Sequence, residues 1–310
     1  MPKKILLDCD PGIDDALAIA LAHGSDGIEV VGLTSVAGNV DLDNTTNNAL
    51  RLAEYYGLDA PVARGADRAL LRDNVRADHV HGTNGLGGVV LPAASRSAVD
   101  EHAVEFIIDR LRSAPGEISL VAVGPLTNIA LALRREPRVA EWAAEFVIMG
   151  GSFGRGNVTP AAEFNIGADP EAAAVVFGAP WRTTMVGLDL TLQARASEPV
   201  RARFSDLGRL ERELISPVLD FAGRNEQYRE HGPAVHDVCA VARVLDPGLI
   251  TAVPARVEVE TAGRFTTGMT VVDFNAPAER CNAEVATELD QDAFWDVVTA
   301  GFRKVAAGLP

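Results

Sequence analysis

Residues 4–15 read KILLDCDPGIDD, a short apolar run that leads directly into a group of aspartates. Residues 4–9 predict a buried strand, because they form a short apolar run that ends at turn-forming residues. Pro11 and Gly12 predict a tight turn after the strand, and the apolar pattern of 16–21 predicts a helix. Since strand, turn and helix are the repeating unit of parallel sheets, the stretch predicts an α/β fold.

The rest of the chain repeats this alternation of short apolar runs and amphipathic stretches. The pattern is typical of a Rossmann-like, open and mostly parallel sheet flanked by helices. A late β-hairpin is predicted within 255–274, around Gly263. No repeat or linker divides the sequence, so residues 1–310 are predicted to form a single domain. The predicted strands are 4–9, 29–36, 118–123, 145–149 and 182–186, and the predicted helices are 16–21, 44–56, 103–111, 128–133 and 171–177.

The composition argues against several classes of function. The formal net charge of −15 disfavours nucleic acid and anionic membrane surfaces as partners. No apolar stretch approaches the roughly 18 residues of a membrane helix, and the first apolar run is too short for a signal peptide. Cys9, Cys239 and Cys281 are widely spaced and form no CxxC pair, which indicates a reducing compartment. We therefore expect a cytoplasmic protein.

The four aspartates within residues 8–15 are the strongest indication of function. Carboxylates this close repel one another, and a hard cation would offset the repulsion; calcium accepts about 6–8 oxygens in flexible geometry. The turn can bring Asp10 and Asp15 toward one point, which predicts a metal site. The alternative is that Asp14 or Asp15 only caps the following helix. The run is not an EF-hand loop, because the alternating ligands and terminal glutamate are missing.

Polar side chains also follow two other predicted strands, at the sheet edge where parallel sheets bind ligands. Asn39 follows the second strand, and the loop after the fourth contains Asn157, Glu163 and Asn165. Amides that donate and accept, next to a carboxylate that accepts, suit recognition of a polyol. The alternative is that these residues belong to ordinary turns and surface loops.

Two further segments have a structural and a functional interpretation. Thr127 or Asn128 is predicted to cap a helix after the third strand, and Asp169 to cap a helix that begins with proline. His236 and Asp237 stand together at the head of an apolar helix. They are either a surface histidine and a helix cap, or a proton donor that titrates near neutral pH and a distal metal ligand.

Taken in order, these motifs resemble those of one family, the inosine–uridine-preferring nucleoside hydrolases. The resemblance covers nearly the whole chain and implies the fold of that family. It implies Ca²⁺-dependent hydrolysis of the N-glycosidic bond of ribonucleosides to ribose and free base, by a homodimer or homotetramer. His236 favours the branch that accepts both inosine and uridine. The matching segments are 8–16 (DCDPGIDDA), 38–39 (GN), 79–82 (HVHG), 124–128 (GPLTN), 149–151 (MGG), 163–165 (EFN) and 235–237 (VHD).

The resemblance also implies roles for individual residues. Asp10, Asp15, Asp237 and the backbone carbonyl of Val123 would hold the Ca²⁺, with the ribose 2′- and 3′-hydroxyls and one water completing its shell. Asp10 would be the general base that takes a proton from water. His236 is the candidate general acid that gives a proton to the departing base.

The substrate would be bound by residues from several loops. Asp14 and the polar residues after the strands would hold the ribose hydroxyls, and Met149 would pack beneath the sugar. His81 is a second, weaker candidate acid near the base, and Tyr228 would contact the base. The substrate-binding residues implied in this way are Asp14, Asn39, His81, Met149, Asn157, Glu163, Phe164, Asn165 and Tyr228.

Three other functions are weighed against the sequence, and its residues disfavour each of them. Phosphatases of the haloacid dehalogenase type also begin with a strand that ends in Asp-x-Asp, but here Pro11 follows the second aspartate and lysine is nearly absent after Lys4. A dinucleotide-binding enzyme is disfavoured, because no GxGxxG follows the first strand. A calcium-stabilised nucleoside-binding protein without activity would be indicated by substitution of Asp10, which is present.

Overall fold

The computed structural model describes residues 1–225 and 231–309. Within them, a sheet of nine strands has the order β3-β2-β1-β4-β5-β6-β9-β7-β8. Neighbouring strands from β3 to β9 run parallel, whereas β7 is antiparallel to both β9 and β8. The strands are β1 (Lys3–Cys9), β2 (Ile28–Ser35), β3 (Val62–Arg64), β4 (Ile118–Ala122), β5 (Glu145–Met149), β6 (Thr183–Val186), β7 (Ile250–Val259), β8 (Thr270–Asp273) and β9 (Ala283–Leu289).

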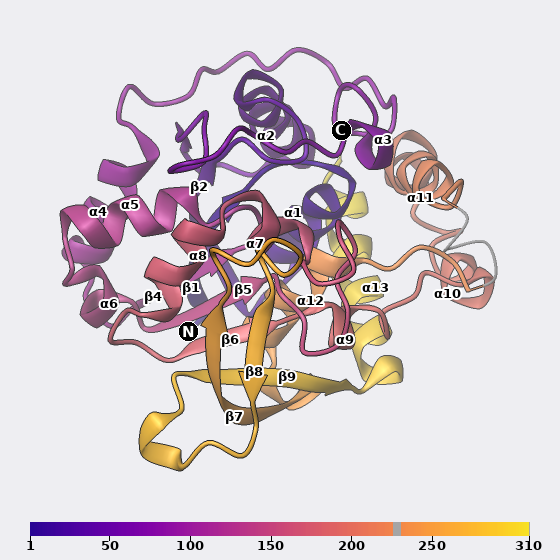
Figure 1. The fold of residues 1–310 in the computed structure, drawn as a ribbon. Coiled ribbons are helices and arrows are strands. Elements are labelled where there is room, and N and C mark those ends of the chain that lie inside the picture. The colour runs from indigo at the N-terminus through magenta and orange to yellow at the C-terminus, as the bar shows by residue number, and fades with distance from the viewer. Residues whose placement is uncertain (226–230, 310) are drawn as a thin grey trace.

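Helices cover both faces of the sheet (Figure 1). The core on one face includes α1, α12 and α13, and the core on the other includes α4, α5 and α8. The mostly parallel sheet between two helical layers confirms the predicted fold class. The helices are α1 (Ile13–Gly24), α2 (Leu42–Tyr56), α3 (Asp78–His81), α4 (Ala103–Ser113), α5 (Thr127–Arg135), α6 (Val139–Trp142), α7 (Phe164–Ala168), α8 (Pro170–Phe177), α9 (Leu188–Thr191), α10 (Glu198–Ala202), α11 (Ser216–Ala222), α12 (His236–Leu245) and α13 (Gln291–Gly308).

Strand β1 shows why the sheet needs two helical layers. Ile5, Leu7 and Cys9 belong to the core on the α1 face, and Leu6 belongs to the core on the α4 face. Successive residues of a strand point to opposite faces of a sheet. A strand buried on both faces is therefore apolar along its whole length, as the first apolar run of the sequence is.

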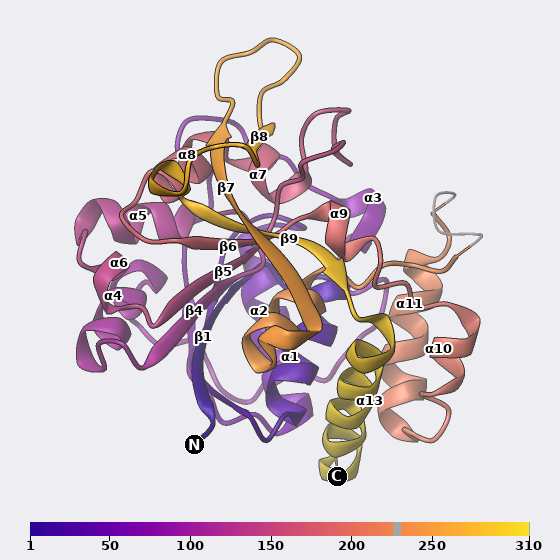
Figure 2. The ribbon, with the colours of Figure 1, turned by 90° about the horizontal axis from the view of Figure 1, so that it is seen from below.

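The predicted late hairpin is present. Strands β7 and β8 pair antiparallel, with Val257 opposite Val272. β7 also pairs with β9, which joins the hairpin to the parallel strands. Figure 2 shows the segment between β7 and β8 projecting from the rest of the protein, and Phe265 on this segment is exposed.

The predicted strands and helices are all present, and their ends differ from the predictions by at most three residues. Strands β3 and β9 and helix α13 are not among the predicted elements. β3 has only three residues, too few to show a pattern. β9 reads AEVATEL, and its mixture of polar and apolar residues resembles a short helix as closely as a strand.

The two predicted helix caps have different outcomes. Asp169 caps α8 as predicted, since its Oδ1 accepts the Ala172 N–H at 3.0 Å. The prediction that Thr127 or Asn128 caps α5 is wrong, because the N-cap residue is Leu126. The Asn128 amide donates instead to Asp8 Oδ1 at 2.8 Å, and the Thr127 hydroxyl donates to Asp169 Oδ2 at 2.7 Å. Tertiary partners have replaced the local ones.

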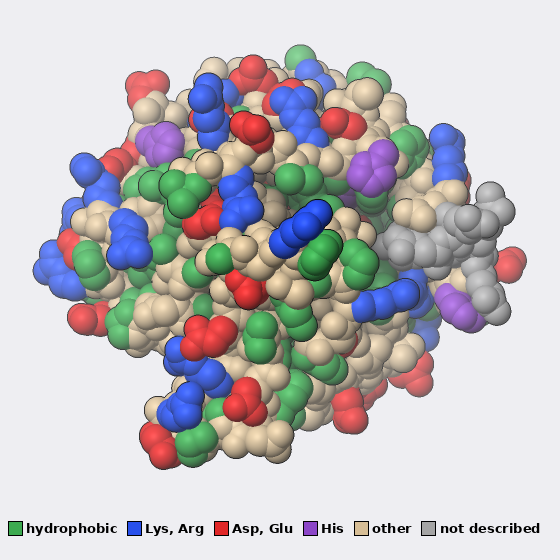
Figure 3. All heavy atoms as spheres, in the orientation of Figure 1, with side chains coloured by type: hydrophobic (Ala, Val, Ile, Leu, Met, Phe, Trp, Pro, Cys, Tyr) green, Lys and Arg blue, Asp and Glu red, His purple; other side chains and the backbone are tan. Residues whose placement is uncertain are grey.

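Charged side chains of both signs are interspersed over the face drawn in Figure 3, and many form ion pairs. The described part of the chain contains no helix with the length and apolar character needed to span a bilayer.

Candidate active site

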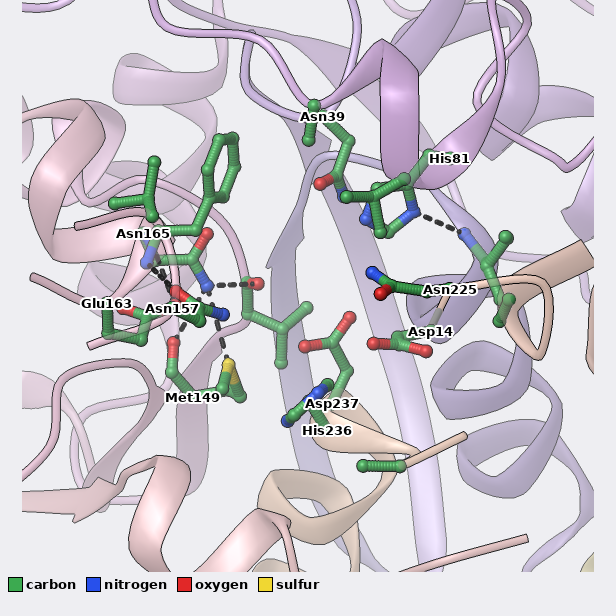
Figure 4. Close-up of a pocket in the computed structure, with 18 of the residues that line it drawn as sticks. Asp14, Asn39, His81, Met149, Asn157, Glu163, Asn165, Asn225, His236 and Asp237 are labelled. Carbon is green, nitrogen blue, oxygen red and sulfur yellow. Dashed lines mark hydrogen bonds between the residues drawn. The ribbon is translucent and has the colours of Figure 1, made fainter. Parts of the chain in front are cut away.

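A cavity lies beyond the carboxyl ends of the parallel strands, where open α/β sheets bind ligands. Residues that follow β1, β2 and β4 line it, together with the end of β5, helix α3 and the start of α12. Figure 4 shows side chains from these elements arranged around a common space. The predicted site residues that line the cavity are Asp14, Asn39, His81, Val123, Met149, Asn157, Glu163, Phe164, Asn165, His236 and Asp237.

Two predicted residues that the structure describes are not part of this lining. Asp10 and Asp15 are fully buried, and their contacts with Asn39 and Asp237 place them directly behind the cavity wall. Tyr228 lies outside the described residues.

The turn between β1 and α1 places the aspartates. Asp15 accepts the Gly12 N–H at 2.9 Å and the Asp10 N–H at 3.1 Å, so it holds the turn and the start of α1 together. A Cβ on Gly12 would lie 2.5 Å from His81 Nδ1 and 2.7 Å from Asn39 Nδ2. Glycine is therefore required here, because two side chains of the site pack directly on its backbone.

Asp14 has a different role from its neighbour. Its carboxylate accepts a hydrogen bond from the backbone N–H of His236, which is at the start of α12. The interaction satisfies one of the unpaired N–H groups of the first turn of α12. Asp14 therefore joins the two helix starts that face the cavity, and the local alternative for Asp14, a cap on its own helix α1, is wrong.

The Asp10 carboxylate is tightly enclosed. Its Oδ2 accepts the Asn39 N–H at 2.7 Å, whereas its Oδ1 is buried with no hydrogen-bond partner. A Cβ on Gly38 would overlap Oδ2, and a Cβ on Gly124 would lie 2.7 Å from Oδ1. A buried carboxylate oxygen without a donor is costly unless a positive charge compensates it.

Burial also dominates the electrostatics of the aspartate group. It raises the pKa of Asp10 and Asp237 well above the ordinary value, and repulsion by Asp15 raises both further. The same two causes raise the pKa of Asp14 to about 8. The Asp15 and Asp237 side chains also interact directly, which raises the pKa of Asp237 and lowers that of Asp15. These carboxyl groups cannot all ionise together without added positive charge.

The donor set fits a hard cation better than a transition metal. It consists of carboxylate oxygens and the nearby Val123 carbonyl, which is the chemistry that calcium prefers. Within residues 1–225 and 231–309, no three histidine, cysteine, aspartate or glutamate side chains are already arranged to hold a metal ion. A cation would offset both the unpartnered Asp10 oxygen and the repulsion that Asp237 experiences from Asp15 and Asp10.

The opposite wall of the cavity is built around helix α7. Glu163 caps this helix by accepting the N–H groups of Asn165 and Ile166, and it also accepts the Gly151 N–H at 2.8 Å. The Asn165 amide donates to Val123 O at 2.8 Å and to Met149 O at 3.0 Å. Asn165 thereby ties together the ends of two neighbouring strands, β4 and β5.

The remaining part of this wall is the loop before α7. Asn157 Oδ1 accepts the Phe164 N–H at 3.0 Å, which sets the loop against the start of the helix. Met149, at the end of β5, is buried beneath the Asn165 amide. The wall therefore presents fixed amide and carboxylate groups above an apolar floor.

Two histidines, His81 and His236, also line the cavity. His81 Nδ1 accepts the Ile13 N–H at 3.1 Å, so the proton of the neutral ring is on Nε2. Burial, followed by charge repulsion from His236 and His79, lowers the pKa of His81 to about 3. Burial, followed by the charge of Arg195, lowers the pKa of His236 to about 4. Both shifts favour the neutral form of the ring.

His236 is buried, so its interpretation as a surface histidine is wrong. Its lowered pKa also differs from the sequence-based expectation of titration near neutral pH. The reason is that desolvation disfavours the imidazolium ion, and a sequence does not reveal desolvation.

Three residues that the structure brings to the site have no role predicted from the sequence. His79 and Asn225 line the cavity, and Thr191 Oγ1 lies 2.7 Å from His236 Nδ1. His79 belongs to a segment that carries the family resemblance, which was a usable signal. Thr191 stands 45 residues from His236 on another helix, so no local pattern pointed to it.

Comparison with known proteins identifies the family of the chain. The sequence model of the inosine-uridine preferring nucleoside hydrolase family matches residues 5–296. The chain belongs to this family. As a nucleoside hydrolase, it is an enzyme of the N-glycosidase class.

Relatives within the family differ in the nucleosides for which they are named. The chain is 45% identical over 311 residues to an inosine-uridine preferring nucleoside hydrolase of Crithidia fasciculata, covering 98% of this chain and 99% of the relative. It is 41% identical over 299 residues to the pyrimidine-specific ribonucleoside hydrolase RihB of Escherichia coli, covering 96% of both chains. Membership of the nucleoside hydrolase family therefore does not select the base.

A solved structure agrees in fold. The purine-preferring ribonucleoside hydrolase from Gardnerella vaginalis superposes with a TM-score of 0.92 at 33% identity, covering 98% of this chain and 99% of that one. The nucleoside hydrolase fold thus extends over nearly the whole chain.

Proposed function

We propose that this enzyme hydrolyses ribonucleosides, with inosine and uridine among its substrates, to ribose and free base in a Ca²⁺-dependent reaction. The observation that carries the proposal is the group of buried aspartates behind a cavity lined with amides and carboxylates. The buried aspartates suit a cation, and the amide and carboxylate lining of the cavity suits a polyol. The name of the relative from Crithidia fasciculata supports the choice of inosine and uridine.

Asp10, Asp15, Asp237 and the Val123 carbonyl are the proposed ligands of Ca²⁺. When bound, the ion supplies positive charge that offsets the carboxylate repulsion, orients the ribose diol and makes water more acidic. Asn165 holds the Val123 carbonyl in place through its 2.8 Å hydrogen bond. A carbonyl oxygen has a second lone pair, so this bond is compatible with a further ligand.

The ribose is proposed to lie between the aspartates and the α7 wall. Met149 forms an apolar surface under the sugar ring, and the polar groups around it pair with the hydroxyls. Because these groups are already fixed by hydrogen bonds to backbone, little ordering is needed when the sugar binds. The proposed ribose-binding residues are Asp14, Asn39, Asn157, Glu163 and Asn165.

In the proposed reaction, the bond between ribose C1′ and the base nitrogen breaks with its electron pair remaining on the base. Positive charge develops on the sugar ring, as in other glycoside hydrolyses. The carboxylates near the ribose stabilise that charge, a contribution typically of several kcal/mol. The water oxygen bonds to C1′, and Asp10 takes the water proton as general base.

The base takes up one proton and water gives up one, so the reaction balances without another reagent. His236 is the proposed general acid, because its ring lines the cavity. His81 is the second candidate, since its Nε2 carries the ring proton. Phe164 and Tyr228 remain proposed substrate contacts.

The proposal is tested by the release of reducing sugar from inosine, adenosine, guanosine, uridine and cytidine. Wild type is compared with Asp10→Ala, with the exposed Asp59→Ala as matched control, and 2′-deoxyinosine serves as a further substrate. We expect fast release from ribosides, little from the deoxy analogue, and a loss of at least ~100-fold only in Asp10→Ala. No release from any riboside by folded, calcium-loaded wild type would refute hydrolysis and leave a nucleoside-binding protein as the alternative.

Several further properties stay predictions. These are the homodimeric or homotetrameric state, the cytoplasmic location and the organisation of residues 1–310 as a single domain.

A further inference from the structure

Thr191 ends helix α9 and is fully buried. Its Oγ1 lies 2.7 Å from Nδ1 of His236. We propose that Thr191 is a positioning residue that donates its hydroxyl proton to Nδ1 and so keeps the ring proton of His236 on Nε2. The inference rests on the proposed function of His236 and extends it to a residue that does not line the cavity.

The direction of this hydrogen bond follows from the hydroxyl group. A threonine hydroxyl has one proton to donate, and within the described residues the Thr191 hydroxyl makes no second hydrogen bond. If Nδ1 were the donor, the buried hydroxyl proton would have no acceptor, which is unfavourable. The arrangement in which Thr191 donates satisfies the hydroxyl and makes Nδ1 an acceptor.

Backbone hydrogen bonds hold the two residues in this arrangement. The Thr191 N–H donates to Gly187 O at 3.0 Å, and Leu188 N–H donates to Gly151 O at 2.9 Å, which ties α9 to the end of β5. On the other side, Val235 N–H donates to Ala194 O at 3.0 Å. The segment that leads into His236 is thereby hydrogen-bonded to the segment that follows Thr191.

The consequence for catalysis is a fixed tautomer. A neutral imidazole carries its proton on either nitrogen, and the hydrogen bond at one nitrogen decides which. With Nδ1 accepting from Thr191, Nε2–H is the group that donates a hydrogen bond to the departing base, and this bond strengthens as negative charge develops on the base. Without the hydroxyl, part of the population would carry the proton on the wrong nitrogen and the ring would be free to rotate.

Kinetics on two kinds of leaving group test this positioning. In Thr191→Val, which keeps the size and removes the hydroxyl, we expect kcat for inosine to fall by about 10- to 100-fold, part of the contribution of a general acid. KM should change less than about twofold, because the ribose contacts remain intact. The kcat for 4-nitrophenyl β-ribofuranoside should be unchanged, since nitrophenolate leaves without being protonated. Thr191→Ser should recover most of the inosine activity.

Control variants separate positioning from folding. Thr299→Val removes another buried threonine hydroxyl, which bonds only Trp295 O on α13, and should leave both activities unchanged. If Thr191→Val lowered kcat equally for both substrates, or if Thr191→Ser did not recover inosine hydrolysis, the role of Thr191 would be merely structural and the proposal would be overturned. Unchanged inosine hydrolysis in Thr191→Val would also overturn it.

A spectroscopic measurement distinguishes failure of this inference from failure of the proposed function. The ¹⁵N chemical shifts of the His236 ring report which nitrogen carries the proton, whether or not the ring takes part in catalysis. Wild type should show the Nε2–H form and Thr191→Val a mixture; an Nδ1–H form in wild type would refute the inference. If His236→Ala keeps full inosine activity, the general-acid assignment fails, and the ¹⁵N shifts still decide the role of Thr191.

Discussion

The Asp10 carboxylate shows how individual residues shape the site. Small residues surround it: Gly38 and Gly124 leave no room for a Cβ near its two oxygens. Its position is set by the Asn39 N–H, and its second oxygen has no donor. A carboxylate enclosed in this way cannot move aside, so its geometry depends on neighbours that carry no chemistry themselves.

Gly38→Ala is therefore expected to impair activity although it adds only one methyl group. The new Cβ would overlap Asp10 Oδ2 and would also lie 2.8 Å from Pro125 Cδ. We expect kcat/KM on inosine to fall by at least ~10-fold, since displacements of about 1 Å at a catalytic group can cost up to 100-fold.

Gly308→Ala is the matched control, because nothing lies within 4 Å of the Cβ that it would add. It should keep wild-type kinetics and wild-type unfolding. A Gly38→Ala protein with wild-type kcat/KM would show that Asp10 is not confined by this glycine.

At the scale of the elements, local pattern predicted most strands but fewer of the helices, and not every end. The prediction placed α1 at 16–21, whereas the helix is Ile13–Gly24. The earlier start depends on Asp15, which accepts the Gly12 N–H and so caps the helix from inside its first turn. Capping by a residue that is also a proposed metal ligand does not show in the apolar pattern.

The cap of α8 joins three elements and should matter for stability rather than activity. Asp169 is fully buried and accepts from Ala172 N, Leu70 N and the Thr127 hydroxyl. Asp169→Ala leaves these donors unpaired, so we expect the free energy of unfolding to fall by about 2–4 kcal/mol. KM for inosine should stay within about twofold, because Asp169 does not line the cavity.

Asp290→Ala provides the comparison in urea unfolding experiments. Asp290 caps α13 through one hydrogen bond and is exposed, so its loss should cost about 1 kcal/mol. Equal losses in the two variants would contradict the role assigned to the buried network around Asp169.

At the scale of the whole molecule, folding brings four carboxyl groups together at a cost in repulsion. Asp14 and Asp15 come from the start of α1, Asp10 from the turn before it, and Asp237 from α12, more than two hundred residues later in the sequence. A ligand that binds only the folded arrangement stabilises it in proportion to its concentration. The proposed Ca²⁺ site therefore couples metal binding to the stability of the protein.

Ca²⁺ is accordingly expected to stabilise the protein against heat. At about 100 times its dissociation constant, it should add about 2.7 kcal/mol to the free energy of unfolding. The measurement is calorimetric unfolding with Ca²⁺ and with a chelator. Asp10→Asn should lose the stabilisation and Asp59→Asn, at an exposed position, should keep it. An identical Tm for wild type in both conditions would argue against the calcium site.

The sequence by itself determined the fold class, because a strand buried on both faces must be apolar throughout and β1 shows that pattern. It also predicted most of the residues that meet in the cavity, some because parallel strands end at one edge of the sheet and others, such as His81 and Met149, through the family resemblance. Only the tertiary structure decided how the aspartates divide their roles, that Asn128 binds Asp8 instead of capping α5, and that Thr191 meets His236. These contacts join residues far apart in the chain, and the burial that shifts their pKa values exists only after folding.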